Sequence, residues 1–193
     1  FKGENFSLSL LVPAGTTQLP GDEEIASLSG VLEHPPLLSK RNGGVLRATL
    51  ENGSRILIQE NPRLPVFAVH AGVIGGLLME DEANNGIHNF IATMLTQGTP
   101  SLSSSQLVHE VEQLGGSLSG SAGNNTFSLS GTFPSKQVER GLGIFLDVLL
   151  HPTFPEEALE KKRREILTRI KNREERAHTQ AFRLFFQTLF LSH

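Results

Sequence analysis

The spacing of hydrophobic residues changes from a period of two to a helical period and back, which predicts alternating blocks of strands and helices. Strands are predicted at residues 45–50 and 55–59, where Asn52-Gly53 between alternating apolar runs is a strong hairpin signal. A third strand is predicted at residues 66–74, before Gly75-Gly76. The first block of the main domain is therefore a hairpin and one further strand.

Helical spacing follows in two segments. Apolar residues first recur at helical intervals between Ile87 and Leu95, with Asn84 or Asn85 as the predicted N-cap. A second helix is predicted after Ser103, which forms a capping box with Gln106. The period then returns to two in residues 117–122 and 126–133, the predicted second hairpin.

Two more helices are predicted towards the C-terminus. One has apolar residues from Val138 to Leu149, and a long one extends from a predicted capping box at Thr153-Phe154-Pro155-Glu156 to Phe185. The order of elements predicts an α+β fold: a mainly antiparallel sheet of about five to six strands with helices packed on one face.

The residues before the main domain have a different composition. Residues 1–13 contain a short apolar strand, predicted to be the C-terminal strand of a preceding domain. Residues 14–44 are rich in Gly, Pro, Ser and Thr and are predicted to be a linker. The main domain is expected at 45–193, and we interpret the chain as a fragment whose parent continues after residue 193.

Composition and charge exclude several classes of function. The chain has 193 residues, 38% of them hydrophobic, and 17 basic against 20 acidic residues give a net charge of −3, so a nucleic-acid partner is not expected. No apolar run is long enough for a membrane span. The chain lacks Cys, Tyr and Trp, which excludes disulfides and cysteine metal ligands. The basic run at 161–164 is interleaved with Glu, which predicts a salt-bridged solvent-facing helix.

The segment Gly86-Ile87-His88-Asn89-Phe90-Ile91-Ala92-Thr93-Met94-Leu95-Thr96-Gln97-Gly98-Thr99 resembles the zinc-site helix of the insulinase-like (pitrilysin, or inverzincin) metallopeptidases. Other segments resemble that family in the same order along the chain: Leu50-Glu51-Asn52-Gly53-Ser54-Arg55, Gly75-Gly76 with Glu80, Leu114-Gly115-Gly116-Ser117-Leu118, and His151-Pro152-Thr153-Phe154. The resemblance implies the α+β processing-peptidase fold over residues 45–190.

The residues that carry the chemistry in the family are replaced here. The resemblance places Asn89 and Thr93 where the family has its two zinc-binding His, and Ala92 where it has the Glu that activates water. Arg169 stands where the third zinc ligand, a Glu, is expected. The neighbouring His88 has Ala92 one turn on, so it has no second ligand there. The resemblance therefore implies a catalytically inactive domain without a metal or cofactor.

A non-catalytic member implies a homologous active domain, in cis or as a separate subunit, that holds the zinc. Our hypothesis is that this chain supports proteolysis by that domain as a chamber wall, a peptide-binding surface and a dimer contact. Peptide substrate would add as a strand along Ser117, Leu118, Ser119, Gly120 and Ser121. A homodimer is one form of the assembly, and the resemblance to bacterial relatives suggests a periplasmic protein.

Two other readings remain open. One is a structural or assembly subunit without a role in proteolysis. The other is an unrelated α+β binding module, which a different strand order would reveal.

Overall fold

The computed structural model describes residues 6–12, 37–42, 45–50, 52–61, 63–175 and 177–189, the first two segments by their backbone alone. The chain divides into two units, residues 1–154 and 155–193. None of the described helices is both long and apolar enough to cross a membrane.

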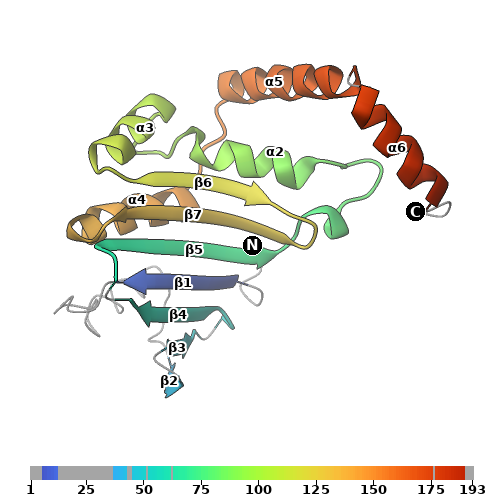
Figure 1. The fold of residues 1–193 in the computed structure, drawn as a ribbon. Coiled ribbons are helices and arrows are strands. Elements are labelled where there is room, and N and C mark those ends of the chain that lie inside the picture. Colours follow the sequence, from blue (N-terminus) through green and yellow to red (C-terminus); the bar gives the residue numbers. More distant parts are fainter. Residues whose placement is uncertain are drawn as a thin grey trace. The chain divides into compact units, whose positions relative to one another are not determined.

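The first unit is built on one seven-stranded sheet with the order β2-β3-β4-β1-β5-β7-β6 (Figure 1). Its strands are β1 (Phe6–Val12), β2 (Leu37–Asn42), β3 (Val45–Thr49), β4 (Arg55–Glu60), β5 (Val66–Ile74), β6 (Ser117–Ala122) and β7 (Thr126–Pro134). All pairs are antiparallel except β1 with β4. The α+β class and the mainly antiparallel sheet are confirmed.

The sheet has one strand more than the upper end of the prediction because both segments before residue 45 join it. Strand β1 pairs with β4 on one side and β5 on the other. Strand β2, inside the predicted linker 14–44, pairs with β3. The remaining linker residues, 14–36 and 43–44, lie outside the described residues. Assignment of residues 1–13 to a preceding domain stays a prediction.

Both predicted hairpins are present. In the first, Gly53 has a φ of 79°, and the Leu50 N–H donates to the Ser54 carbonyl at 2.8 Å. In the second, β6 and β7 are joined by a turn in which the Gly123 N–H donates to the Thr126 carbonyl at 2.8 Å. Asn-Gly and Gly-Asn turns adopt such conformations at low cost, which is why these hairpins were predictable.

The described part of the first unit also holds three α-helices: α2 (Ile87–Met94), α3 (Ser104–Gln113) and α4 (Val138–Leu150), accompanied by the short 3₁₀ turns η2 (Leu77–Met79), η3 (Leu95–Gln97) and η4 (Ser135–Gln137). Helix α2 lies along β6, and α4 packs on β7 and β5. The predicted capping box at Ser103 and Gln106 is present.

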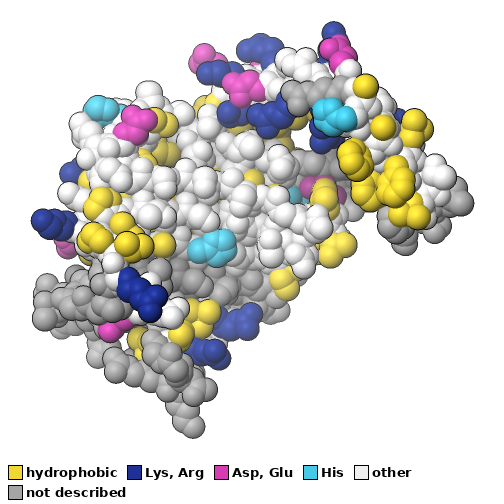
Figure 2. Space-filling view, in the orientation of Figure 1, with side chains coloured by type: hydrophobic (Ala, Val, Ile, Leu, Met, Phe, Trp, Pro, Cys, Tyr) yellow, Lys and Arg dark blue, Asp and Glu magenta, His cyan; other side chains and the backbone are white. Residues whose placement is uncertain are grey.

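The two faces of the sheet differ in chemistry. The face under the helices holds a core that includes Phe67, Phe133 and Phe145, all at most 1% exposed, with the first two rings stacked 5.4 Å apart. On the opposite face, cross-strand register aligns β6, β7 and β5 residues with small, mostly hydroxyl side chains: Ser117, Ser119, Ser121, Ser128, Ser130, Thr132, Ala68, His70 and Gly72. Accordingly, the surface over these strands is mostly white in Figure 2.

The second unit contains α5 (Glu156–Glu174) and α6 (Ala177–Leu189). Two expectations were wrong here. The long helix is two helices, and α5 begins after Pro155 without any side-chain cap, so Thr153 does not form a capping box. Instead the Thr153 N–H donates to the Gly98 carbonyl at 2.9 Å, which holds Thr153 in the first unit.

Candidate functional site

Helix α2 starts without a capping side chain of its own. The residue before it, Gly86, has a φ of 91° and a ψ of 0°, a left-handed conformation that glycine tolerates best. The cap comes from Glu80, whose Oε2 accepts the Gly86 N–H at 2.7 Å and whose Oε1 accepts the His88 N–H at 2.9 Å. A carboxylate at a helix N-terminus satisfies backbone donors and complements the helix dipole.

The Glu80 side chain is 4% exposed, and its Oε1 also lies 3.1 Å from Nδ1 of His88. The hydrogen bonds from the Gly86 and His88 backbone hold the pKa of Glu80 below its usual value of 4.5, against burial, which raises it. The His88 ring is also edge-on to Phe127, with centroids 6.4 Å apart. His88 is thus tied to the helix start rather than to a second candidate ligand.

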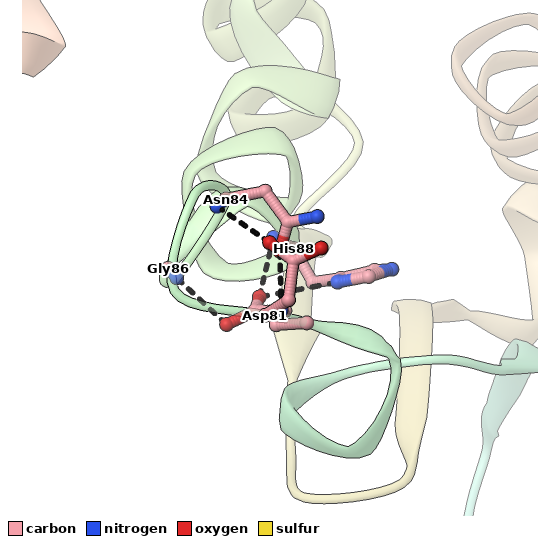
Figure 3. A network of polar contacts seen from close by, with 5 residues as sticks. Asp81, Asn84, Gly86 and His88 are labelled. Atoms are coloured by element: carbon pink, nitrogen blue, oxygen red, sulfur yellow. Dashed lines mark hydrogen bonds and ion pairs between the residues drawn. The ribbon is translucent and has the colours of Figure 1, made fainter.

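The turn before α2 is closed by reciprocal side-chain bonds (Figure 3). Asp81 Oδ1 accepts the N–H groups of Ala83 at 2.9 Å and Asn84 at 3.1 Å, and Asn84 Oδ1 accepts the Asp81 N–H at 2.7 Å. The prediction that Asn84 or Asn85 caps α2 was therefore wrong. Sequence reasoning missed Glu80 as the cap because it acts from six and eight residues away, outside the usual capping spacing.

The three predicted site positions of α2 lie in its central turns. Asn89 is exposed, and Thr93, one turn on, is half-buried with its Oγ1 donating to the Phe90 carbonyl at 2.8 Å. Ala92 is 2% exposed. The structure brings these residues together on one helix, where they present an amide, a hydroxyl and a methyl group.

Helix α2 approaches the edge strand β6 closely at Ala92. A Cβ built on Gly120 would lie 2.2 Å from the Ala92 carbonyl oxygen, so only glycine fits there without a shift of the backbone. This contact sets α2 directly along the strand predicted to bind peptide. On that strand Ser117, Ser119 and Ser121 are exposed, while Leu118 and Gly120 are half-buried on the helix side.

Arg169, the fourth predicted position, is exposed on α5 in the second unit. It lines a shallow pocket on that helix together with Lys161, Arg164, Glu165, Thr168, Asn172 and Arg173. A guanidinium has no lone pair for a metal, and three of its six neighbours in this pocket are also cations.

Among the described residues, no group of three or more His, Cys, Asp or Glu side chains is placed to hold a metal ion. One cluster contains the residue types of a nucleophilic site: Ser101, Asp147 and His151. Ser101 donates to Asp147 at 2.6 Å, and Nδ1 of His151 lies 3.3 Å from the other Asp147 oxygen. The hydroxyl is bonded to the carboxylate and not to the imidazole, so the cluster lacks the nucleophile–histidine contact of a catalytic triad.

Asp147 instead anchors the loop after α2 to α4. Burial raises the pKa of Asp147, but hydrogen bonds from Ser101, Thr99 and His151 outweigh it and leave the pKa lowered. Thr99 also accepts the Leu102 N–H at 3.1 Å. This cluster is therefore a structural support for the end of the α2 segment.

The amino-acid sequence is similar to parts of zinc proteases and processing peptidases. It is 24% identical over 127 residues to the "uncharacterized zinc protease YmxG" of Bacillus subtilis, covering 66% of this chain and 31% of that protein. It is 29% identical over 118 residues to the mitochondrial-processing peptidase subunit beta of Blastocladiella emersonii, covering 61% and 25%. The chain thus matches about a third or less of the length of these relatives.

Solved structures share the fold. A peptidase M16 inactive domain from Pseudomonas fluorescens superposes with a TM-score of 0.66 at 20% identity, over 74% of this chain and 35% of that one. The periplasmic protease PqqL of Escherichia coli also gives 0.66, at 16% identity, over 79% and 17%.

The family model described as "Insulinase (Peptidase family M16)" matches residues 55–191, from β4 through α6. This range includes α2, the edge strand β6 and the helix that carries Arg169. The resemblance seen in the sequence motifs is confirmed: the chain belongs to the insulinase family of peptidases.

Proposed function

We propose that this chain is a non-catalytic insulinase-family domain that supports proteolysis by a paired, active zinc-peptidase domain. The observation that carries the proposal is the chemistry of α2. Its three site positions hold Asn89, Ala92 and Thr93, and Ala92 is buried with its carbonyl against Gly120 of β6.

These residues do not fit a zinc ion. Zinc in proteins is bound by His, Cys, Asp or Glu, and none of the four predicted positions holds one. The Thr93 hydroxyl is already bonded to the helix backbone, and Ala92 has no group that accepts a proton from water. No catalytic step is therefore assigned to this chain, and the zinc and its chemistry belong to the partner domain.

Peptide binding is proposed along β6. This strand ends the sheet order and pairs with β7 on its inner side, and no other described strand pairs with its outer edge, where a peptide would add as a further strand. The exposed side chains of Ser117, Ser119 and Ser121 are small, which leaves room for a second backbone beside them. The adjoining hydroxyl-rich face of the sheet would form the chamber wall.

Exposed apolar side chains support the presence of a partner domain. On η2, Leu77, Leu78 and Met79 are 55%, 75% and 61% exposed. Backbone bonds from Leu77 and Leu78 to the β6–β7 turn hold them in place. Clustered exposed apolar residues typically mark interaction surfaces. A homologous domain or a second copy of the chain would cover them.

The periplasmic location is also a proposal, supported by the fold shared with the periplasmic protease PqqL. The alternative function is a structural or assembly subunit without a role in proteolysis. It differs from the leading proposal in one measurable property, because such a subunit has no need to bind peptide.

The first test is the zinc content of the purified chain after dialysis against low metal, measured beside a peptide-hydrolysis assay with and without added zinc. We expect substoichiometric zinc and no turnover. The matched variant is Asn89→His combined with Ala92→Glu and Thr93→His, which installs the two helix ligands and the base and should raise zinc affinity. Stoichiometric zinc with hydrolysis by the unaltered chain would overturn the proposal.

The second test distinguishes a role in proteolysis from a purely structural or assembly role. An unstructured, uncharged peptide is titrated into the chain and binding is followed by calorimetry. Binding supports the role in proteolysis, whereas its absence favours the assembly subunit.

A further inference from the structure

The cations of α5 fall into two groups according to their partners. Lys162 Nζ lies 2.9 Å from Glu165, and Arg163 lies 3.3 Å from Glu160, so these two are ion-paired. The other five, Lys161, Arg164, Arg169, Lys171 and Arg173, form no ion pair with any other described residue. In Figure 2 dark-blue side chains gather along α5.

Four of these five cations line the shallow pocket on α5 and define what we call the basic stripe: Lys161, Arg164, Arg169 and Arg173. They are three, five and four residues apart in turn, and their side chains border the same pocket. The pocket contains one acidic residue, Glu165, which is already bonded to Lys162. Thr168 and Asn172 add neutral polar groups between the charges.

We propose that the basic stripe binds acidic side chains of a peptide, which makes peptides with spaced Asp or Glu residues the preferred substrate class of the proposed assembly. This inference rests on the proposed function and adds a charge preference to it. The guanidinium group matches a carboxylate bidentately, and three of the four cations are Arg.

The arrangement of the stripe predicts the spacing of the acidic residues. Glu165 separates Lys161 and Arg164 from Arg169 and Arg173. At a rise of 1.5 Å per residue, the centres of these two cation pairs are about 13 Å apart along the helix. An extended peptide covers about 13 Å in four residues, so acidic residues at i and i+4 would meet both pairs.

Glu165 also favours a peptide over a nucleic acid. The hydrogen bond from Lys162 and the nearby charges of Lys161 and Arg169 hold the pKa of Glu165 below its usual value, so this carboxyl is ionised at neutral pH. A nucleic-acid strand places a phosphate about every 3.4 Å, so one would face this carboxylate. A peptide can place an uncharged residue there. The net charge of −3 gives a polyanion no further attraction.

The test is fluorescence anisotropy with a labelled twelve-residue peptide carrying two Glu four residues apart, against the same peptide with Gln at both positions. The full chain is titrated at low salt and at about 0.15 M salt, where screening acts over about 8 Å. We expect the Glu peptide to bind about tenfold more tightly at low salt, with the difference shrinking in salt.

The key variant is Arg164→Gln with Arg169→Gln, matched by Arg163→Gln with Lys171→Gln, which removes the same charge from the same helix outside the stripe. All four side chains are exposed, so both variants should fold. The first should abolish the preference for Glu and the second should retain it. Equal losses in both variants would overturn the proposal, because net charge alone would then explain binding.

Three further outcomes would each overturn part of the proposal. Equal binding of the Glu and Gln peptides overturns the basic stripe while the proposed peptide-binding function survives. Binding of neither peptide overturns both. A single-stranded DNA oligonucleotide is the comparison ligand, and tighter stripe-dependent binding of DNA than of the Glu peptide would overturn the choice of a peptide.

Discussion

The start and the centre of α2 differ sharply in their chemistry. At the start, a nearly buried carboxylate, two backbone donors and an imidazole are bonded to one another. From the next residue on, the positions that would hold metal and base carry an amide, a methyl and a hydroxyl, and the backbone of Ala92 lies against Gly120 on β6. The residues that cap and anchor this helix are therefore different from the residues at its zinc-site positions. The helix can therefore keep its place without a zinc site.

The largest effect is expected where α2 contacts β6 at Gly120. Gly120→Val should lower the free energy of unfolding by about 3 kcal/mol, because the new side chain meets the Ala92 backbone. Chemical denaturation measures this loss. Ser119→Val on the exposed face of the same strand is the control and should change stability far less. Equal effects would show that α2 does not rest on Gly120.

The next effect concerns the start of the helix. Glu80→Gln keeps the shape of the side chain but removes the charge that accepts the Gly86 and His88 N–H groups, so the Tm should fall by a few degrees. Thermal unfolding by circular dichroism measures the shift. Glu82→Gln, an exposed neighbour, is the matched control. An unchanged Tm for Glu80→Gln would show that Glu80 does not anchor α2.

Acid should act through the same carboxyl. Because the folded-state pKa of Glu80 is below its unfolded value near 4.5, its stabilisation is complete above that value and is lost as the pH falls through the folded pKa. Stability should therefore decline below about pH 4.5, and Glu80→Gln should make the decline shallower. Tm values from about pH 6 down to about pH 3 give both slopes. Parallel slopes would assign the acid sensitivity to other groups, of which Asp147 is one.

The smallest effect is expected at the predicted site. Asn89→Ala should change stability by no more than about 0.5 kcal/mol, because the side chain is exposed. Zinc content and hydrolysis should also be unchanged. A loss of bound zinc in this variant would show that the centre of α2 holds metal after all.

Local patterns predicted most of the elements correctly. Both hairpins and the capping box at Ser103 were predictable because turn and cap chemistry depends on residues two to four positions apart. The order of the motifs predicted the family, and the family is confirmed. The same motifs placed Asn89, Ala92 and Thr93 at the family's zinc-site positions. Their role as replaced site positions remains a proposal.

The amino-acid sequence by itself determined the alternating faces of the strands, the apolar stripes of the helices and the chemistry available at each site position. Only the tertiary structure decided that β1 and β2 enter the sheet and that Glu80 caps α2. It also decided that, among the described residues, Lys162 and Arg163 are the α5 cations that pair with Glu165 and Glu160. The physical reason is that these contacts join residues far apart along the chain or depend on which of several possible partners a side chain meets. Strand pairing and remote capping depend on contacts that no local period encodes, and ion pairing depends on which of several nearby charges a side chain reaches.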